Sequence, residues 1–308
     1  MKEFYTLADL KKWKTTAPDI APVIRLGIFG DPVAHSLSPQ IQNAALQACG
    51  LDLQYAPFQI HPDELGTALR LLPGLGFVGV NLTVPHKVAA AGLVDELDPA
   101  AKQAGAINTI RVEGERLLGF NTDGSGFARA IRQEFSVDLR DLRVLLLGAG
   151  GGAGRAIARQ CAVEGCERLV LVNRTFEKAE QLADELRSSF QEARVLGPVA
   201  RLEAVEWTEA ALRFQIANID LLINATSLGM RRSDPPVLAD SLLAPHLMVY
   251  DTIYTPARTI LMHAAVEAGA RAANGLSMLL HQGALSFETW FDRDAPLEAM
   301  RKALKLPL

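Results

Sequence analysis

Apolar runs of strand length alternate with amphipathic stretches through the first half of the chain. The runs at 24–29, 54–60 and 78–83 predict strands, and the stretches at 39–49 and 62–72 have the apolar spacing of helices. A shorter apolar run at 117–120 leads into turn residues at 121–124. Strands that alternate with helices favour an α/β domain with a mostly parallel sheet.

The second half of the chain repeats this alternation. Strands are expected at 144–148, 168–172, 221–224 and 248–251, and two amphipathic helices, 277–290 and 296–304, end the chain. We therefore expect an α/β protein of two domains with a boundary near residue 123. The first domain is 1–123, the second is 124–274, and helices in 275–308 pack back on the first.

A glycine-rich turn follows the first strand of the second half. Residues 148–154 read Gly-Ala-Gly-Gly-Gly-Ala-Gly, directly before a helical pattern. A backbone without Cβ can turn sharply there, so that a pyrophosphate reaches the first N–H groups of the helix. After the second strand, where such folds usually carry an acid for the adenosine ribose, this chain has Asn173-Arg174-Thr175. A cation suits a 2′-phosphate, so the sequence predicts a Rossmann-type domain that binds NADP rather than NAD.

Polar residues gather where apolar strands of the first half end. Ser36 and Ser38 follow the first strand, Lys87 follows the third, and Asn108 and Asp123 stand beside later ones. Ligands of open α/β sheets bind outside the carboxyl ends of the strands. Two hydroxyls could hold a small carboxylate, while an amide, a carboxylate and an ammonium suit a ring that carries several hydroxyls.

Each of these residues also has a purely structural interpretation. The serines before Pro39 could cap a helix, and Lys87 could be a solvated lysine in the first turn of a helix. Asp123 and Asn108 are ordinary turn residues. Their joint occurrence at successive strand ends, upstream of a cofactor motif, favours a functional site.

Composition excludes several other classes of protein. The 308 residues are 49% hydrophobic and 21% charged, with a net charge of −4 and no basic cluster, which argues against a nucleic-acid partner. The first residues lack the apolar core of a signal peptide, and no apolar run approaches the roughly 20 residues of a membrane span. The 3 cysteines lack a CxxC pair and the 6 histidines lack ligand spacing. We expect Cys161 and Cys166 to be packing residues, the protein to be cytoplasmic, and no metal to be bound.

Over residues 24–292 the chain closely resembles the shikimate dehydrogenase family, whose NADP-dependent enzymes reduce 3-dehydroshikimate to shikimate. The motifs that carry the resemblance occur in the family's order. They are Gly30-Asp-Pro, His35-Ser-Leu-Ser-Pro39, Asn81-Leu-Thr-Val-Pro-His-Lys87, Gly105-Ala-Ile-Asn-Thr109, Gly119-Phe-Asn-Thr-Asp-Gly124, Gly148-Ala-Gly-Gly-Gly-Ala153, Asn173-Arg-Thr175, Asn224-Ala-Thr-Ser-Leu-Gly-Met230, Asp251-Thr-Ile-Tyr254 and Gly275 with Met278-Leu-Leu-His-Gln282.

The resemblance implies a role for each matching residue. Lys87 and Asp123 match the catalytic pair, with Lys87 as general acid in reduction and general base in oxidation. The implied substrate ligands are Ser36, Ser38, Thr83, Asn108, Tyr254 and Gln282. The implied NADP ligands are Gly148, Ala149, Gly150, Gly151, Gly152, Ala153, Asn173, Arg174, Thr175, Lys178, Thr226, Gly275 and Met278. In the family this reaction belongs to chorismate and aromatic amino acid biosynthesis, and the sequence leaves a catabolic use open.

The chain departs from the family pattern in places. Gln42 stands where a histidine is usual, and Thr255-Pro256 replaces an Asn-Pro pair. Residues 1–23 precede the usual start, and Leu7, Leu10 and Trp13 could form a short helix that docks on the body or makes a subunit contact, as in a homodimer.

Alternative functions differ in substrate, cofactor or activity. A sister enzyme could act on quinate or use NAD, since Glu177 lies close to Arg174. A sensor with the same fold would bind the ligand without turnover, although Lys87 and Asp123 are both retained. A reductase for a tRNA-bound substrate would need a catalytic cysteine and a basic surface; Cys49 at a helix end does not supply the first, and no basic surface occurs.

Overall fold

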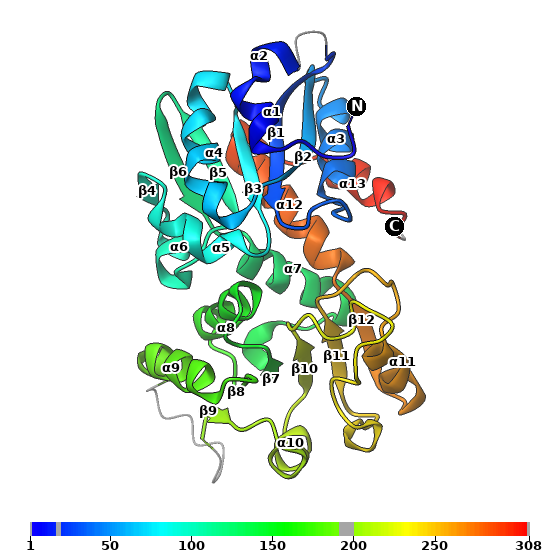
Figure 1. Cartoon of the computed structure of the whole chain (residues 1–308). Coiled ribbons are helices and arrows are strands. Elements are labelled where there is room, and N and C mark those ends of the chain that lie inside the picture. Colours follow the sequence, from blue (N-terminus) through cyan, green and yellow to red (C-terminus); the bar gives the residue numbers. More distant parts are fainter. Residues whose placement is uncertain (1, 17–19, 191–199, 307–308) are drawn as a thin grey trace. The chain divides into compact units, whose positions relative to one another are not determined.

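The computed structural model describes residues 2–16, 20–190 and 200–306, and the chain divides into two compact units (Figure 1). The first unit comprises Met1–Gly126 and Leu279–Leu308, and the second comprises Phe127–Met278. Helices α7 (Asp123–Phe135) and α12 (Leu276–Phe291) each begin in one unit and continue into the other. The prediction that the C-terminal helices pack on the first domain is confirmed, because α13 (Leu297–Ala303) and most of α12 belong to the first unit.

The first unit is built on a mixed sheet with the strand order β2-β1-β3-β5-β6-β4. Its strands are β1 (Val23–Gly30), β2 (Leu53–Gln59), β3 (Gly79–Leu82), β4 (Glu96–Leu97), β5 (Thr109–Glu113) and β6 (Arg116–Phe120). Strand β1 is parallel to β2 and β3, whereas β5 is antiparallel to β3 and β6. The sequence did not predict β5, which forms a hairpin with β6 around Gly114, a residue with φ of 59°.

Short helices precede or connect these strands. They are α1 (Leu7–Lys11), α2 (Trp13–Thr16), α3 (Ser38–Ala48), α4 (Leu65–Leu71), α5 (His86–Ala89) and α6 (Pro99–Ala104). Helix α6 shows how local sequence sets such bounds: the Asp98 carboxylate accepts a bond from the Ala101 N–H, Pro99 opens the first turn, and Gly105 ends the helix in a left-handed conformation.

The N-terminal segment packs into the core of the first unit. Leu7, Leu10 and Trp13 are buried, and the Trp13 ring lies 5.6 Å from the Phe58 ring and 5.7 Å from the Phe77 ring, centre to centre. Tyr5 pairs with β2, since its N–H donates to the Pro57 carbonyl and its carbonyl accepts from the Gln59 N–H. Of the two roles that the sequence left open for this segment, the structure shows docking on the body.

The second unit is a parallel sheet covered by helices. Its strands are β7 (Arg143–Leu147), β8 (Arg168–Val172), β9 (Leu202–Val205), β10 (Leu221–Asn224), β11 (Met248–Asp251) and β12 (Arg271–Asn274), and its other helices are α8 (Gly152–Glu164), α9 (Phe176–Leu186), α10 (Glu209–Ile216) and α11 (Ile260–Glu267). The strand order β9-β8-β7-β10-β11-β12 is that of a Rossmann dinucleotide-binding sheet (Figure 1). The predicted Rossmann fold is confirmed.

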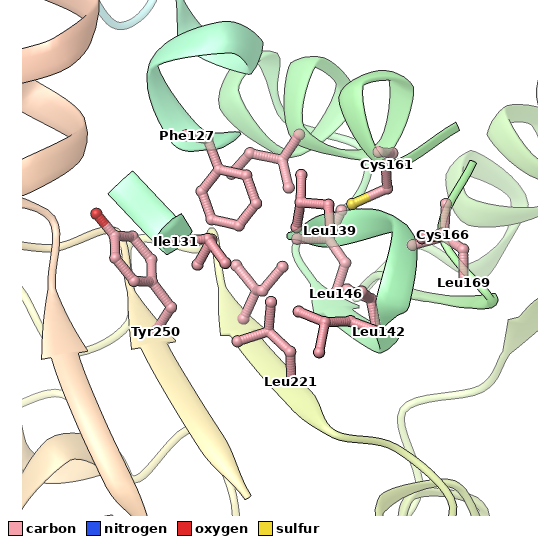
Figure 2. Close-up of a cluster of buried hydrophobic side chains, with 14 of the residues drawn as sticks. Phe127, Ile131, Leu139, Leu142, Leu146, Cys161, Cys166, Leu169, Leu221 and Tyr250 are labelled. Atoms are coloured by element: carbon pink, nitrogen blue, oxygen red, sulfur yellow. The ribbon is translucent and has the colours of Figure 1, made fainter. Parts of the chain in front are cut away.

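Both faces of this sheet are buried, which explains its continuous apolar strands. Along β7, Val144 and Leu146 belong to a core cluster on one face, and Leu145 and Leu147 belong to a cluster on the other. Figure 2 shows the first cluster, in which Phe127 and Ile131 of α7, Leu146 and Tyr250 are drawn together with Cys161 and Cys166. Both cysteines are buried there as free thiols, as packing residues should be. Within the described residues, no helix is long and apolar enough to cross a membrane.

Candidate active site

The side chains of Lys87 and Asp123 form an ion pair in the first unit. Lys87 lies in α5, after β3, and Asp123 begins α7, after β6. The Lys87 Nζ donates to Asp123 Oδ2 at 2.6 Å, and the lysine side chain is 18% exposed against 3% for the aspartate. The carboxylate therefore lies inside the protein while the ammonium keeps access to solvent. Neither structural alternative fits, because Lys87 is not a solvated surface lysine and the Asp123 carboxylate faces side chains rather than helix N–H groups.

Asn108 supports this pair from the sheet. It precedes β5 and is buried, and its Nδ2 donates to Asp123 Oδ1 at 2.9 Å. The same Nδ2 lies 3.3 Å from Oε1 of Gln282 in α12, whose own Nε2 donates to the Leu279 carbonyl at 2.8 Å. Lys87, Asp123, Asn108 and Gln282 thus form one hydrogen-bonded group, although the sequence placed the first three at separate strand ends and Gln282 in a C-terminal helix.

The other predicted substrate residues of the first unit lie in loops after β1 and β3. Ser36 Oγ accepts a bond from the Ser38 N–H at 3.2 Å, and Ser38 is buried at the start of α3. Ser36 thus bonds the first N–H of α3, which agrees in part with the capping interpretation, while the N-cap residue itself is Leu37. Thr83 packs on Gly30 so closely that a Cβ at Gly30 would lie 2.4 Å from Thr83 Cγ2.

The glycine-rich turn of the second unit connects β7 to α8. Gly148 has a φ of 87°, in the left-handed region that favours glycine. Gly154 lies in the first turns of α8, where a Cβ would come within 2.2 Å of the Gly148 carbonyl oxygen. The close approach of strand end and helix start therefore depends on glycine at both positions. The N–H groups at the start of α8 can donate to an anion such as a pyrophosphate.

The segment after β8 lies beside this turn. The Asn173 Oδ1 accepts a bond from the Gly150 N–H at 3.2 Å, while its Nδ2 donates to the Thr175 carbonyl at 2.9 Å. Arg174, Thr175 and Lys178 are exposed. Asn173 thus links the glycine turn to the segment that carries the predicted 2′-phosphate ligands.

Thr226 is fixed by a buried network after β10. Its N–H and hydroxyl both donate to Asn224 Oδ1, at 3.0 Å and 2.7 Å, and Asn224 Nδ2 donates to Asp251 Oδ1 at 3.1 Å. Burial raises the pKa of Asp251, although the Thr259 hydroxyl donates to the carboxylate at 2.7 Å. Asn224 and Asp251 belong to the family motifs, but the sequence analysis gave them no role.

The remaining predicted residues also lie in the second unit. Tyr254 is half-buried after β11 and belongs to a different unit from the other predicted substrate ligands. Gly275 is buried, and a Cβ there would lie 2.0 Å from the Thr252 carbonyl oxygen. Met278 is part of the core cluster, and its N–H donates to the Tyr250 hydroxyl at 3.1 Å. No contact described here tests a role for Met278 in lining the nicotinamide, which stays a prediction.

Two other buried side chains of the first unit make well-defined hydrogen bonds. His86 donates its Nε2–H to the Ile60 carbonyl at 2.8 Å, and burial lowers its pKa, which fits a packing residue. Gln42 is buried and donates to the Gly283 carbonyl at 2.8 Å, beside Gln282. Among the residues at 2–16, 20–190 and 200–306, no group of three or more His, Cys, Asp or Glu side chains could hold a metal ion.

Sequence profiles of one family match most of the two units. The shikimate dehydrogenase substrate binding domain matches residues 28–110, the shikimate / quinate 5-dehydrogenase profile matches 129–228, and the shikimate 5′-dehydrogenase C-terminal domain matches 275–305. These ranges contain the predicted residues Lys87, Asn108, Arg174 and Gln282.

Individual relatives agree with the profiles. A shikimate dehydrogenase (NADP⁺) of Methanopyrus kandleri is 42% identical over 281 residues, which are 91% of this chain and 94% of that protein. A crystal structure of a shikimate dehydrogenase in complex with NADP⁺ aligns with a TM-score of 0.82 at 33% identity, over 93% of this chain and 96% of the other. The Thermus thermophilus shikimate 5-dehydrogenase in complex with NADP(H) and shikimate aligns with a TM-score of 0.80 at 34% identity, over 92% and 99%. The resemblance seen in the sequence is confirmed, and the chain belongs to the shikimate dehydrogenase family.

Proposed function

We propose that this protein catalyses the reversible, NADP-dependent reduction of 3-dehydroshikimate to shikimate, as an oxidoreductase acting on a CH–OH group. The observation that carries the proposal is the Lys87–Asp123 pair, with a 2.6 Å bond and a buried carboxylate. A protein that only bound the ligand would not need this proton-transferring pair. Retention of the pair therefore favours an enzyme over a sensor of the same fold.

Lys87 is the residue that moves the proton. During reduction of a ketone, negative charge develops on the carbonyl oxygen, and an ammonium can stabilise this charge and then donate its proton. Asp123 holds Nζ in place through Oδ2, and Asn108 holds Asp123 through Oδ1. In the oxidation direction the neutral amine accepts the proton of the hydroxyl.

The glycine turn of the second unit fits a dinucleotide. When NADPH is bound, it supplies the hydride that reduces the ketone carbon. Gly148 to Ala153 would hold its pyrophosphate at the start of α8, and the exposed cations Arg174 and Lys178 would bind the 2′-phosphate. Asn173 and Thr175 form the segment that presents Arg174, and Thr226, Gly275 and Met278 would lie along the nicotinamide half.

The residues of the first unit would hold the substrate. Ser36 and Ser38 suit the carboxylate, while Thr83, Asn108 and Gln282 suit the ring hydroxyls, because both donors and acceptors are present. Tyr254 would add a contact to the carboxylate. We accordingly assign substrate binding and catalysis to 1–123 with the helices of 275–308, and NADP binding to 124–274.

A steady-state assay tests this proposal. Absorbance of NAD(P)H is followed while shikimate and quinate are each combined with NADP⁺ and with NAD⁺. We expect turnover to be dominated by shikimate with NADP⁺. Turnover mainly with quinate or NAD⁺ would assign the protein to a sister activity, and ligand binding without turnover would support the sensor.

Two further expectations concern the protein as a whole. A cytoplasmic location and a homodimeric state stay predictions. Cell fractionation tests the first, and light scattering coupled to size-exclusion chromatography tests the second. Neither outcome alters the assignment of the reaction.

A further inference from the structure

A cluster of buried polar side chains is hydrogen-bonded to Asn108. It consists of Asn81 on β3, Thr109 on β5 and Ser286 on α12, with exposed fractions of 4%, 0% and 0%. Burying polar groups is costly unless each one is hydrogen-bonded. The cluster joins residues that are far apart in the sequence, since Asn81 and Ser286 are separated by 205 positions.

Hydrogen-bond donors fix the orientation of the Asn108 amide. The Thr122 backbone N–H, which can only donate, lies 2.9 Å from Asn108 Oδ1. The Thr109 Oγ1 lies 3.1 Å from the same oxygen. Because Oδ1 is held by these two groups, Nδ2 must face Asp123 Oδ1 at 2.9 Å and the Thr122 hydroxyl at 2.8 Å.

The Thr109 hydroxyl connects the Asn108 amide to the other two residues of the cluster. Asn81 Nδ2, which can only donate, lies 3.1 Å from Thr109 Oγ1, so this oxygen accepts there. The Ser286 hydroxyl lies 2.8 Å from Thr109 Oγ1. The Ser286 hydroxyl also donates to the Gln282 carbonyl at 2.9 Å, so Thr109 Oγ1 lies between two possible acceptors, Asn108 Oδ1 and Ser286 Oγ.

Asn81 is itself held from both ends. The buried Tyr55 hydroxyl donates to Asn81 Oδ1 at 2.9 Å, which leaves Nδ2 facing the Asn108 carbonyl at 3.0 Å and the Ser286 hydroxyl at 2.9 Å. Every amide in the chain from Tyr55 to Asp123 therefore has one orientation. A buried network whose polar groups all have partners is stiffer than its separate bonds.

We propose that Thr109 and Ser286 are positioning residues for the reaction, which act through Asn108 on the Lys87–Asp123 pair. The proposal rests on the function assigned above to Lys87 and Asp123. Neither hydroxyl is part of the predicted set of ligands. Thr109 supports Asn108 Oδ1 beside the Thr122 N–H, and Ser286 contacts Thr109 from α12.

The sharpest test compares Thr109→Val with Thr109→Ser. Valine keeps the branched shape of the side chain on β5 but removes the hydroxyl, whereas serine keeps the hydroxyl. With shikimate and NADP⁺ we expect Thr109→Val to lower kcat about tenfold, because small misplacements of catalytic groups are costly. KM for NADP⁺ should stay unchanged, and Thr109→Ser should stay within about twofold of wild type since the hydroxyl is kept. Ser286→Ala should lower kcat in the same way but less.

Thr289→Val is the matched control. Thr289 lies one turn along α12 in the same unit, and its hydroxyl donates only to the Leu285 carbonyl of its own helix, at 2.8 Å. We expect normal kinetics from this variant. If Thr109→Val has wild-type kcat, or if Thr109→Ser is as impaired as Thr109→Val, the positioning role is wrong.

An NMR measurement that does not depend on turnover tests this proposal separately from the assignment of the reaction. The side-chain NH₂ resonances of Asn108 in ¹⁵N-labelled protein should shift in Thr109→Val and remain in place in Thr109→Ser and Thr289→Val. If wild-type protein does not oxidise shikimate, the proposed reaction fails while these spectra still test the network. If Thr109→Val does not fold, the spectra and kinetics of Ser286→Ala decide, and wild-type values there would overturn the proposal.

Discussion

The two units prepare their ligand positions in opposite ways. In the first unit the candidate site is made of side chains that hold one another, with Asn108 and Asp123 buried and Lys87 partly open to solvent. In the second unit the glycine turn is made of backbone, and Arg174 beside it is exposed. Removal of a functional group should therefore impair catalysis in the first unit. In the second unit, addition of a single carbon to the glycine turn should impair cofactor binding.

The largest effect is expected from Lys87→Ala. General acid–base assistance contributes about 10²- to 10⁴-fold, so kcat for shikimate oxidation should fall by about a thousandfold. NADPH binding, measured by fluorescence titration, should be nearly unchanged because the glycine turn lies in the other unit. Lys102→Ala, which changes an exposed lysine of α6, should retain wild-type turnover. Near-normal kcat in Lys87→Ala would exclude it as the proton donor.

The second-largest effect is expected from Gly154→Ala, which tests the glycine turn of the second unit. In Gly154→Ala the new Cβ would meet the Gly148 carbonyl oxygen at 2.2 Å, so strand end and helix start must move apart. Overpacking of this kind costs about 2 kcal/mol, which corresponds to about thirtyfold in the KM for NADP⁺. Calorimetric titration should show unchanged shikimate binding. Gly92→Ala, where a Cβ meets open space, serves as control, and equal KM values in the two variants would contradict the close-approach argument.

A smaller effect is expected at the exposed cation. Arg174→Ala should raise the KM for NADP⁺ about tenfold, since a charge-assisted phosphate contact is lost. The KM for NAD⁺ should stay constant because NAD⁺ has no 2′-phosphate. Arg129→Ala, at another exposed arginine of the second unit, should change neither value. An equal rise in KM for both cofactors would show that Arg174 does not bind the 2′-phosphate.

The smallest effect on turnover is expected where only the core changes. Trp13 is 5% exposed and packs among Tyr5, Phe58 and Phe77. Trp13→Ala should lower the free energy of unfolding by about 3 kcal/mol, measured by circular dichroism in urea, and leave kcat unchanged at 25 °C. Lys14→Ala, at the exposed neighbour, should have wild-type stability. A stable Trp13→Ala variant would mean that the N-terminal segment adds little to the first unit.

Sequence reasoning worked best where one pattern had one physical cause. The run Val144–Leu147 is apolar at every position because helices cover both faces of its sheet, and the glycines after it mark a close approach that no other residue allows. The bounds of β8, β10 and β11 agree with the prediction for the same reason.

The elements that sequence reasoning missed carry weaker patterns. Strands β5 and β9, which were not predicted, combine apolar residues with charged ones such as Arg111 and Glu203. The left-handed Gly114 between β5 and β6 was the available signal for the hairpin. Thr109 and Ser286 could not be predicted as neighbours, because their contact depends on how α12 returns to the sheet of the first unit.

The pairing of Tyr5 with β2 has a consequence for behaviour at high concentration. Strand β2 is an outer strand of its sheet, and its Pro57 carbonyl and Gln59 N–H are occupied by Tyr5. Unpaired groups on an outer strand are a template on which a second chain can add. The N-terminal segment thus covers the edge of β2. We expect a protein that lacks this segment to expose the β2 backbone to other copies of the chain and to self-associate.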